Sequence, residues 1–361
     1  MPEAQQPFYF RFTMILLMLG LLSAIIVLGQ DLVVPLSLAT LIAILLIPVC
    51  QFLERRKVPR VLTIVIALLM TVLFVGGIFY FLSSQIANFL DDTDQIKKGI
   101  DAHLGHLQDW IREKFNISNK QQESLVQQME TSLKGSGSGA IGGTVSSLKD
   151  MLVLITLLPI YIFLLLYYRG LIKQFLIDVF TNVPKKRVAE VIQESRVVIQ
   201  AYMFGLIIEM VIVAAINSVG FLIIGIKYAV FLAVFAAVLN ILPYVGMLIA
   251  SIFCVLITLT TSTSAGDALW VLVVLLVVQF IDNNIIMPNI VGSKVKLNAL
   301  MTIIGVVIGG LLCGIAGMFL SIPAIAILKI IFDRVEGLEP WGRLLGDEGN
   351  PSTRQKLSMK K

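Results

Sequence analysis

Charged side chains are scarce in this sequence of 361 residues. Asp, Glu, Lys and Arg make up 14% of the chain, whereas soluble globular proteins contain about 25%. Apolar residues make up 57%, and Phe alone occurs 20 times. The composition excludes a single water-soluble domain. It also excludes an intrinsically disordered chain, because such chains are poor in apolar residues.

Cysteine and histidine are also rare. Cys50, Cys254 and Cys313 lie inside apolar runs, and their spacing fits neither a disulfide framework nor a zinc site. We interpret them as small buried hydrophobic residues. His103 and His106 stand three positions apart between acidic residues, and a solvated helix face explains this pattern better than a metal site does. We predict no metal and no cofactor.

The sequence contains no recognisable motif for hydrolysis. Intramembrane serine proteolysis needs a His near a Ser in a span, and both His residues lie outside the apolar runs. The HExxH and GxxxxGK[ST] patterns are absent as well. The net charge of +5 comes from basic clusters between apolar runs, a pattern that orients membrane proteins. We therefore predict neither an enzyme nor a nucleic-acid-binding protein.

Long apolar segments dominate the chain. A helix needs about 20 apolar residues to cross the hydrocarbon layer of about 30 Å. The first such segment is read as an integral span, because no small-residue cleavage site follows it. The six predicted spans are Phe12–Gly29, Leu32–Leu53, Val61–Leu82, Met151–Tyr168, Phe204–Ile226 and Ala268–Met287.

Basic residues in the short loops set the orientation. The link Glu54–Arg60 carries four basic residues, whereas the link at positions 30–31 carries none. Because Lys and Arg concentrate in cytoplasmic loops, the N-terminus is expected in the cytoplasm. Counting Lys and Arg in the later loops places three further segments in the cytoplasm: Arg169–Arg196, Asn289–Asn298 and the basic C-terminal tail. We expect a multi-pass protein of the inner or plasma membrane with both termini cytoplasmic.

Two apolar stretches, Ala229–Thr261 and Ala299–Ile331, have about 33 residues each, too many for one span and too few for two. We predict two re-entrant broken-helix hairpins that enter from opposite faces. The alternative is that each stretch forms one long tilted span plus an interfacial helix. The helix breakers near the middle of the stretches are Asn240, Pro243 and Gly246 in the first, and Gly314, Gly317, Ser321 and Pro323 in the second.

The predicted fold is thus an all-α polytopic membrane protein with six full spans and two hairpins. Residues 83–150 form a small helical insert outside the cytoplasm that ends in a Gly/Ser-rich linker. The chain divides into a three-span region at 1–82, this insert at 83–150, a core of spans and hairpins at 151–333, and a cytoplasmic tail at 334–361.

Polar residues at depth mark the candidate site. Glu209 and Asp282 lie about 8 to 9 Å from the cytoplasmic ends of their spans, at 1.5 Å per residue. A carboxylate in a span is costly and usually marks an ion or substrate path, so this pair is predicted to couple an ion. For Glu209, snorkelling to the interface is the alternative. Amide residues accompany the two carboxylates at Asn217, Asn240, Gln279, Asn283 and Asn284.

Broken helices expose backbone groups that transporters use to bind ions and polar solutes. We expect the two hairpin tips to meet at mid-membrane, the first near Asn240 and the second at Gly317–Ser321. The predicted substrate-binding residues are Asn240, Pro243, Gly246, Gln279, Asn283, Gly317 and Ser321.

The C-terminal half resembles the autoinducer-2 exporter family of membrane transporters. The resemblance is carried by NILPYVG at 240–246, QFIDNNIIMPNIVG at 279–292 and IGGLLCGIAGMFLSIPAIAILK at 308–329, and in topology it covers nearly the whole chain. It implies export of a small solute or sodium/proton antiport. The chain departs from the family pattern at Phe204, Leu206, Met247 and the Asn298-Ala299 pair, so the cargo is not implied.

The sequence therefore predicts a secondary active transporter or exporter of a small solute or signalling molecule, coupled to a proton or sodium gradient. An antiporter, a passive pore and a non-transporting membrane scaffold are the alternatives. The expected partners are membrane lipid, a small polar solute and H+ or Na+, and a homo-oligomer is left open.

Overall fold

The computed structural model describes residues 7–92, 156–181, 183–243, 245–262, 264–292 and 297–346. These residues are almost entirely helical, and the one β feature among them is an isolated bridge between Leu297 and Gly346. The all-α prediction is confirmed for them. Most of the predicted insert at 83–150 lies outside the described residues, as do His103 and His106.

Within the described ranges, short connections join the helices. The longest helix is α7, with 40 residues. It joins the predicted fifth span to the amphipathic approach to that span, the basic stretch at 184–201, in one helix. The elements are α1 (Phe8–Leu28), α2 (Gln30–Arg55), α3 (Arg60–Asp91), a helix at Thr156–Tyr167, α6 (Arg169–Val179), α7 (Lys185–Ile224), α8 (Ala229–Leu239), α9 (Val245–Thr261), α10 (Ala265–Ile281), the π-helical turns Asp282–Ile286 and Pro288–Gly292, α11 (Ala299–Phe332) and α12 (Glu339–Leu345).

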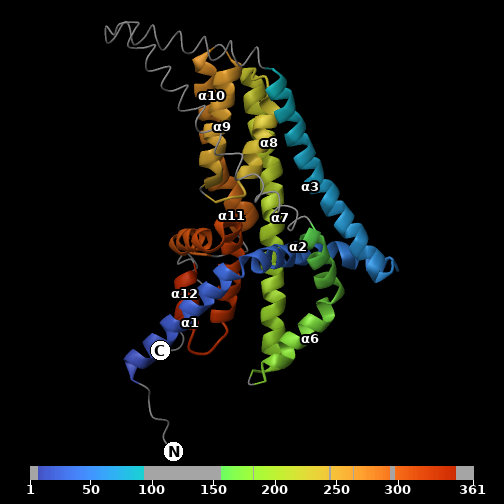
Figure 1. Ribbon diagram of the computed structural model, residues 1–361, viewed down its shortest axis with the longest axis vertical. Coiled ribbons are helices and arrows are strands. Elements are labelled where there is room, and N and C mark those ends of the chain that lie inside the picture. Colours follow the sequence, from blue (N-terminus) through green and yellow to red (C-terminus); the bar gives the residue numbers. More distant parts are fainter. Residues whose placement is uncertain are drawn as a thin grey trace, which may run out of the picture. The chain divides into compact units, whose positions relative to one another are not determined.

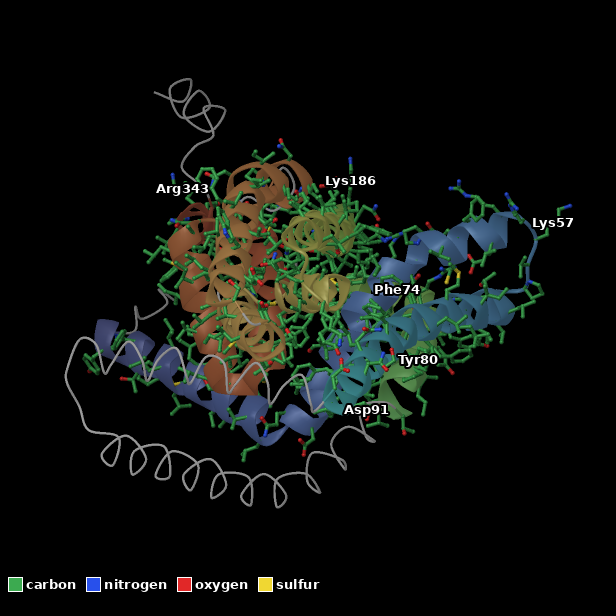
Figure 2. All side chains as sticks on the ribbon, turned by 90° about the horizontal axis from the view of Figure 1, so that it is seen from above. Lys57, Phe74, Tyr80, Asp91, Lys186 and Arg343 are labelled. Carbon is green, nitrogen blue, oxygen red and sulfur yellow. The ribbon has the colours of Figure 1, made fainter. Side chains whose placement is uncertain are left out.

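Several helices are long and apolar enough to cross a membrane. There are five in the described residues, or six if Thr156–Tyr167 and α6, bent by 68° at their junction, form one span. Large apolar side chains also face outward, such as Phe74 and Tyr80 on α3, which are 49% and 78% exposed (Figure 2). Such a surface suits contact with lipid. The chain is thus a multi-pass helical membrane protein, and the count of six full spans stays a prediction.

The chain divides into two compact units, each assembled from separate segments. The first unit combines residues 1–64, 160–204 and 291–361, and the second combines residues 65–159 and 205–290. Each of the two predicted hairpins belongs to one unit: α8 and α9 to the second, and α11 to the first.

In the second unit, α8 and α9 form an antiparallel hairpin that packs beside α10 (Figure 1). The Cys254 thiol lies 3.7 Å from the Leu232 carbonyl oxygen, whereas Gly246 meets Leu239 at the other end of the pair. A Cβ atom on Gly246 would lie 1.7 Å from the Leu239 carbonyl oxygen. Gly246 therefore does not supply the turn itself, as the sequence suggested, but lets α9 approach the end of α8.

In the first unit, α11 folds back on itself. The backbone breaks at Cys313 and at Gly314, whose φ is 59°. The Ser321 hydroxyl donates to the Gly305 carbonyl at 2.8 Å, although these residues would be about 24 Å apart in a continuous helix. A Cβ atom on Gly317 would lie 2.0 Å from the Gly309 carbonyl oxygen. Two helical arms therefore pack together through glycine.

The predicted position of this second tip was wrong. The chain turns at Cys313–Gly314, whereas Gly317 and Ser321 belong to the second arm and serve its packing. Glycine is required at position 314 because a positive φ is costly for other residues. Pro323, also read as a breaker, is accommodated inside the helical arm.

The first arm of the α8–α9 hairpin is short. The 11 residues of α8 extend about 16 Å, half of the hydrocarbon layer. This length favours a re-entrant hairpin, which stays a prediction.

An exposed ion pair closes the base of the α8–α9 hairpin onto the end of α3. Lys227 donates to the Asp92 carboxylate at 2.5 Å, and the Tyr228 hydroxyl donates to the same oxygen. The Lys227 hydrogen bond, followed by that of Tyr228, lowers the pKa of Asp92 below its usual 3.8. The contact therefore stabilises the fold at neutral pH, and this stabilisation disappears as the pH falls through the lowered pKa.

We predict that Gly317→Ala destabilises the protein, because its methyl group would collide with the Gly309 backbone. Overpacking of this kind costs about 1 to 3 kcal/mol. Thermal unfolding of the detergent-solubilised protein should show a lower Tm. Gly20→Ala, where nothing lies within 4 Å of the new Cβ, is the control and should not lower the Tm. Equal Tm values for the two variants would contradict the close packing of the α11 arms.

We also predict that Asp92→Asn lowers the Tm slightly at pH 7. The difference from the parent protein should shrink as the pH falls below 3.8, the usual pKa of this group, because the parent then loses the same charge. Thermal unfolding across a pH series measures this, with Asp91→Asn as the neighbouring control. A difference that persists at the lowest pH would show that the carboxylate charge is not the cause.

Candidate functional site

The predicted ion-coupling residues meet inside the second unit. Glu209 comes from α7, Asn240 ends α8, and Asp282 directly follows α10. The Asn240 Nδ2 atom donates to Glu209 Oε1 at 3.1 Å and to Asp282 Oδ2 at 3.0 Å. One amide group therefore holds two carboxyl groups whose contacting oxygens are no more than about 6 Å apart.

Two further predicted residues extend this group. Gln279, one turn before Asp282, directs its Nε2 atom to Asp282 Oδ2 at 3.5 Å and to Asn283 Oδ1 at 3.2 Å. Gln279 is half-buried and Asn283 is exposed, so Asn283 lies at the edge. We call Glu209, Asn240, Gln279, Asp282 and Asn283 the polar cluster.

The helix carrying Asp282 changes its winding at this point. After the apolar α10, residues 282–286 form a π-helical turn, a rare form that often occurs at functional sites. Nearby amide side chains cover backbone carbonyls: Asn284 donates to Phe280 at 2.8 Å, and Asn289 donates to Ile285 at 2.7 Å. The run of amides after α10 thus supplies hydrogen bonds that help hold the irregular turn.

The two carboxyl groups are buried without a positive partner. Glu209 is 4% exposed and Asp282 is 2% exposed, and among the described residues no Lys or Arg forms an ion pair with either. Glu209 Oε2 and Asp282 Oδ1 are buried and accept no hydrogen bond from the part of the chain that the structure describes. Glu209 therefore does not snorkel to an interface, which was the alternative interpretation of this residue.

Burying two neighbouring carboxylates is unfavourable unless a positive charge compensates them. A proton on one carboxyl group, or a small metal cation between the two, would supply that charge. The two carboxyl groups therefore lie in surroundings that favour a positive charge between them.

A cavity of about 20 Å³ adjoins the cluster. Asn240 and Gln279 line it together with Asn217, and the remaining lining is apolar. This volume suffices for one water molecule. The Asn217 Oδ1 atom is buried without a hydrogen-bond partner among the described residues. Asn217, already marked in the sequence as a polar residue at depth, thus belongs to this region, although it was not among the predicted substrate-binding residues.

The other predicted substrate-binding residues lie elsewhere. Pro243 lies in the turn between α8 and α9, and Gly246 packs on Leu239. Gly317 and Ser321 belong to the first unit, where the Ser321 hydroxyl contacts the carbonyls of Gly305 and Gly317. A shared site at two meeting tips stays a prediction. Among the described residues there is no group of three or more His, Cys, Asp or Glu that could hold a metal ion.

Comparisons with known proteins agree with a role in transport. A family model described as AI-2E family transporter matches residues 12–337. "Putative transport protein YrrI" of Bacillus subtilis is 28% identical over 309 residues, covering 82% of this chain and 85% of that protein. "AI-2 transport protein TqsA" of Escherichia coli is 25% identical over 346 residues, covering 92% of this chain and 95% of that protein. Because the family model spans nearly the whole sequence, the chain belongs to the AI-2E transporter family.

Proposed function

We propose that this membrane transporter is a secondary active exporter of a small polar solute, and that a proton or Na+ bound at the polar cluster drives it. The observation that carries the proposal is the pair of buried carboxyl groups, Glu209 and Asp282, held by one Asn240 amide without a basic partner. Family membership supports transport as the activity, and no enzymatic reaction is proposed.

The geometry suggests how cation binding could move the protein. Asn240 ends the first arm of the α8–α9 hairpin, whereas the carboxyl groups belong to α7 and to the turn after α10. With a cation present, the carboxyl groups can stay close and share the Asn240 amide. Without it, two buried negative charges repel each other. The charge of the cluster would then decide whether the hairpin stays attached to α7 and α10.

The name of TqsA describes that protein as transporting AI-2, and this makes autoinducer-2 a suitable first solute to test here. The arrangement in the membrane belongs to the proposal as well: inner-membrane location, both termini cytoplasmic, and the α8–α9 hairpin entering from the outer face. Because a hairpin begins and ends on one side, Lys227 and Thr261 should share a face.

We predict that Asp282→Asn abolishes gradient-driven transport, with a loss of more than about tenfold, because the amide keeps the shape of the side chain and removes its charge. Glu209→Gln should weaken transport less. The measurement is flux in proteoliposomes under an imposed pH or Na+ gradient. An internal pH dye reports proton movement and an internal Na+ dye reports Na+ movement, whatever the cargo is. Efflux of autoinducer-2 is followed in parallel.

Asp31→Asn, which alters an exposed carboxylate in the first turn of α2, is the matched control and should transport normally. If Asp282→Asn keeps the full gradient dependence, the residue is structural and the coupling proposal fails. Flux in the parent protein that only dissipates solute gradients would identify a passive pore instead.

For the topology, we predict that cysteines introduced at positions 227 and 261 are labelled from the outer face, and those at 55 and 185 from the cytoplasmic face. The experiment uses a background in which Cys50, Cys254 and Cys313 are replaced. It compares a membrane-impermeant thiol reagent on intact cells and on inverted vesicles. Labelling of positions 227 and 261 from opposite faces would eliminate the re-entrant hairpin.

A further inference from the structure

The first unit contains a cavity of about 840 Å³, within the range of about 300 to 1,000 Å³ typical of ligand pockets. Its walls come from α2, α6, the first half of α7 and the second arm of α11. Gln200 on α7 donates to the Ile44 carbonyl on α2 at 2.7 Å, which joins two of these walls. The lining is largely apolar and includes Leu41, Ile44, Ile47, Ile192, Ile199 and Ile327.

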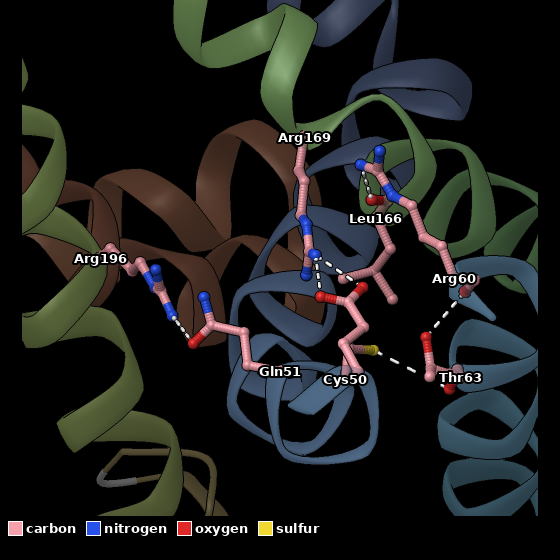
Figure 3. Close-up of polar contacts among 8 residues, drawn as sticks. Cys50, Gln51, Arg60, Thr63, Leu166, Arg169 and Arg196 are labelled. Atoms are coloured by element: carbon pink, nitrogen blue, oxygen red, sulfur yellow. Dashed lines mark hydrogen bonds and ion pairs between the residues drawn. The ribbon is translucent and has the colours of Figure 1, made fainter. Parts of the chain in front are cut away.

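Basic side chains line part of this cavity. Arg169 and Lys173 on α6 and Arg196 on α7 all contribute to it. Arg169 is already neutralised, because its Nη2 atom lies 2.7 and 2.5 Å from the two Glu54 carboxylate oxygens (Figure 3). The position of Arg169 therefore adds a donor to the cavity wall but little net charge.

Arg196 differs from Arg169 in having no acidic partner. Its Nη2 atom donates to the neutral Gln51 Oε1 atom at 3.2 Å (Figure 3), and no carboxylate forms an ion pair with it among the described residues. Its Nε atom is buried, and no acceptor for it lies within the described ranges. A guanidinium group with a free, buried N–H is costly, and an anion at the cavity would satisfy both the charge and the hydrogen bond.

The surroundings of Arg196 determine what kind of anion fits. A small water-soluble anion would leave the apolar walls of the cavity in contact with water, which is unfavourable. An amphiphile with an acidic head and a hydrocarbon tail matches both parts of the lining. Arginine binds phosphate groups through paired N–H donors, and basic pockets between membrane helices bind the headgroups of acidic lipids.

We propose that this cavity binds an anionic phospholipid, with the phosphate at Arg196 and an acyl chain along the isoleucine-rich walls. The lipid would fill the space between α2, α6, α7 and the second arm of α11, and so hold the first unit together. This site is separate from the polar cluster, which belongs to the second unit, and the proposal does not depend on which cation or solute the protein transports.

The test measures the lipid preference of the full-length, delipidated protein. Dioleoylphosphatidylglycerol or dioleoylphosphatidylcholine is added to the detergent-solubilised protein. Thermal unfolding then gives the change in Tm, and native mass spectrometry counts the bound lipid. We expect phosphatidylglycerol to raise the Tm more than phosphatidylcholine does. In Arg196→Gln this difference should disappear, and binding of phosphatidylglycerol should weaken at least fivefold.

Arg187→Gln is the matched control, because Arg187 lies on the same helix but pairs with Glu336 at 3.2 Å and does not line the cavity. This variant should keep the phosphatidylglycerol preference. Ile192→Trp fills the cavity without changing its charge and should also abolish the preference. It replaces Arg196→Gln as the test if that variant fails to fold.

Three outcomes would overturn the proposal. The parent protein could respond equally to both lipids, or the preference could survive both Arg196→Gln and Ile192→Trp. In the third outcome, inorganic phosphate or glycerol phosphate would raise the Tm of the parent protein as much as phosphatidylglycerol does, but would not raise the Tm of Arg196→Gln. That result would identify a site for soluble anions.

Discussion

Within a lipid layer no water is available to hydrogen-bond a carbonyl group, so a chain that turns back there must cover its own backbone with protein. Both hairpins meet this constraint by bringing two helical arms together where glycine removes the intervening side chain. Gly246 approaches the Leu239 carbonyl, and Gly317 approaches that of Gly309. The Ser321 hydroxyl adds hydrogen bonds to the carbonyls of Gly305 and Gly317. Within the second unit, α8 can end at Asn240 because α9 packs tightly against the last residues of α8.

The polar cluster and the lipid cavity show two ways in which buried charge is handled. In the cluster, two acidic groups share one neutral amide, which creates a demand for positive charge. In the cavity, Arg169 forms an ion pair with Glu54, whereas Arg196 donates to the neutral Gln51 side chain. The positive charge of Arg196 is therefore left to be balanced by an anion. Each incomplete set of partners points to a component from outside the chain: a cation in one unit and an acidic lipid in the other.

Much of this could be predicted from residue types. The places of the apolar helices followed from apolar runs, although α3 and α7 are longer than the predicted spans. Glu209, Asn240 and Asp282 were singled out because a polar side chain is costly inside an apolar span. The tip of α11 was misplaced because Gly314, Gly317 and Pro323 are all breakers by composition. Only the backbone conformation shows that position 314 carries the positive φ.

Other features depend on contacts that have no local signal. The contact between Arg196 and Gln51 joins residues 145 positions apart, so no spacing rule could reveal it. The amphipathic approach to the fifth span merged with that span into α7, since nothing in the sequence between them is incompatible with a continuous helix. The π-helical turn at 282–286 could not be predicted from the sequence either, because it differs from an α-helix only in which backbone carbonyl accepts the hydrogen bond of each N–H group.

That turn gives the site an unusual dependence on chain length. A π-helical turn accommodates one residue more than an α-helical turn, so the first turn, at 282–286, adds one surplus position before the second, at 288–292. Removing one residue between 282 and 286 would restore regular winding at the first turn and rotate each following side chain by about 100° relative to α10. Hydropathy would hardly change, yet the acidic and amide side chains of this segment would face new neighbours. In this segment, a change of one residue in chain length would alter the side-chain directions more than a substitution would.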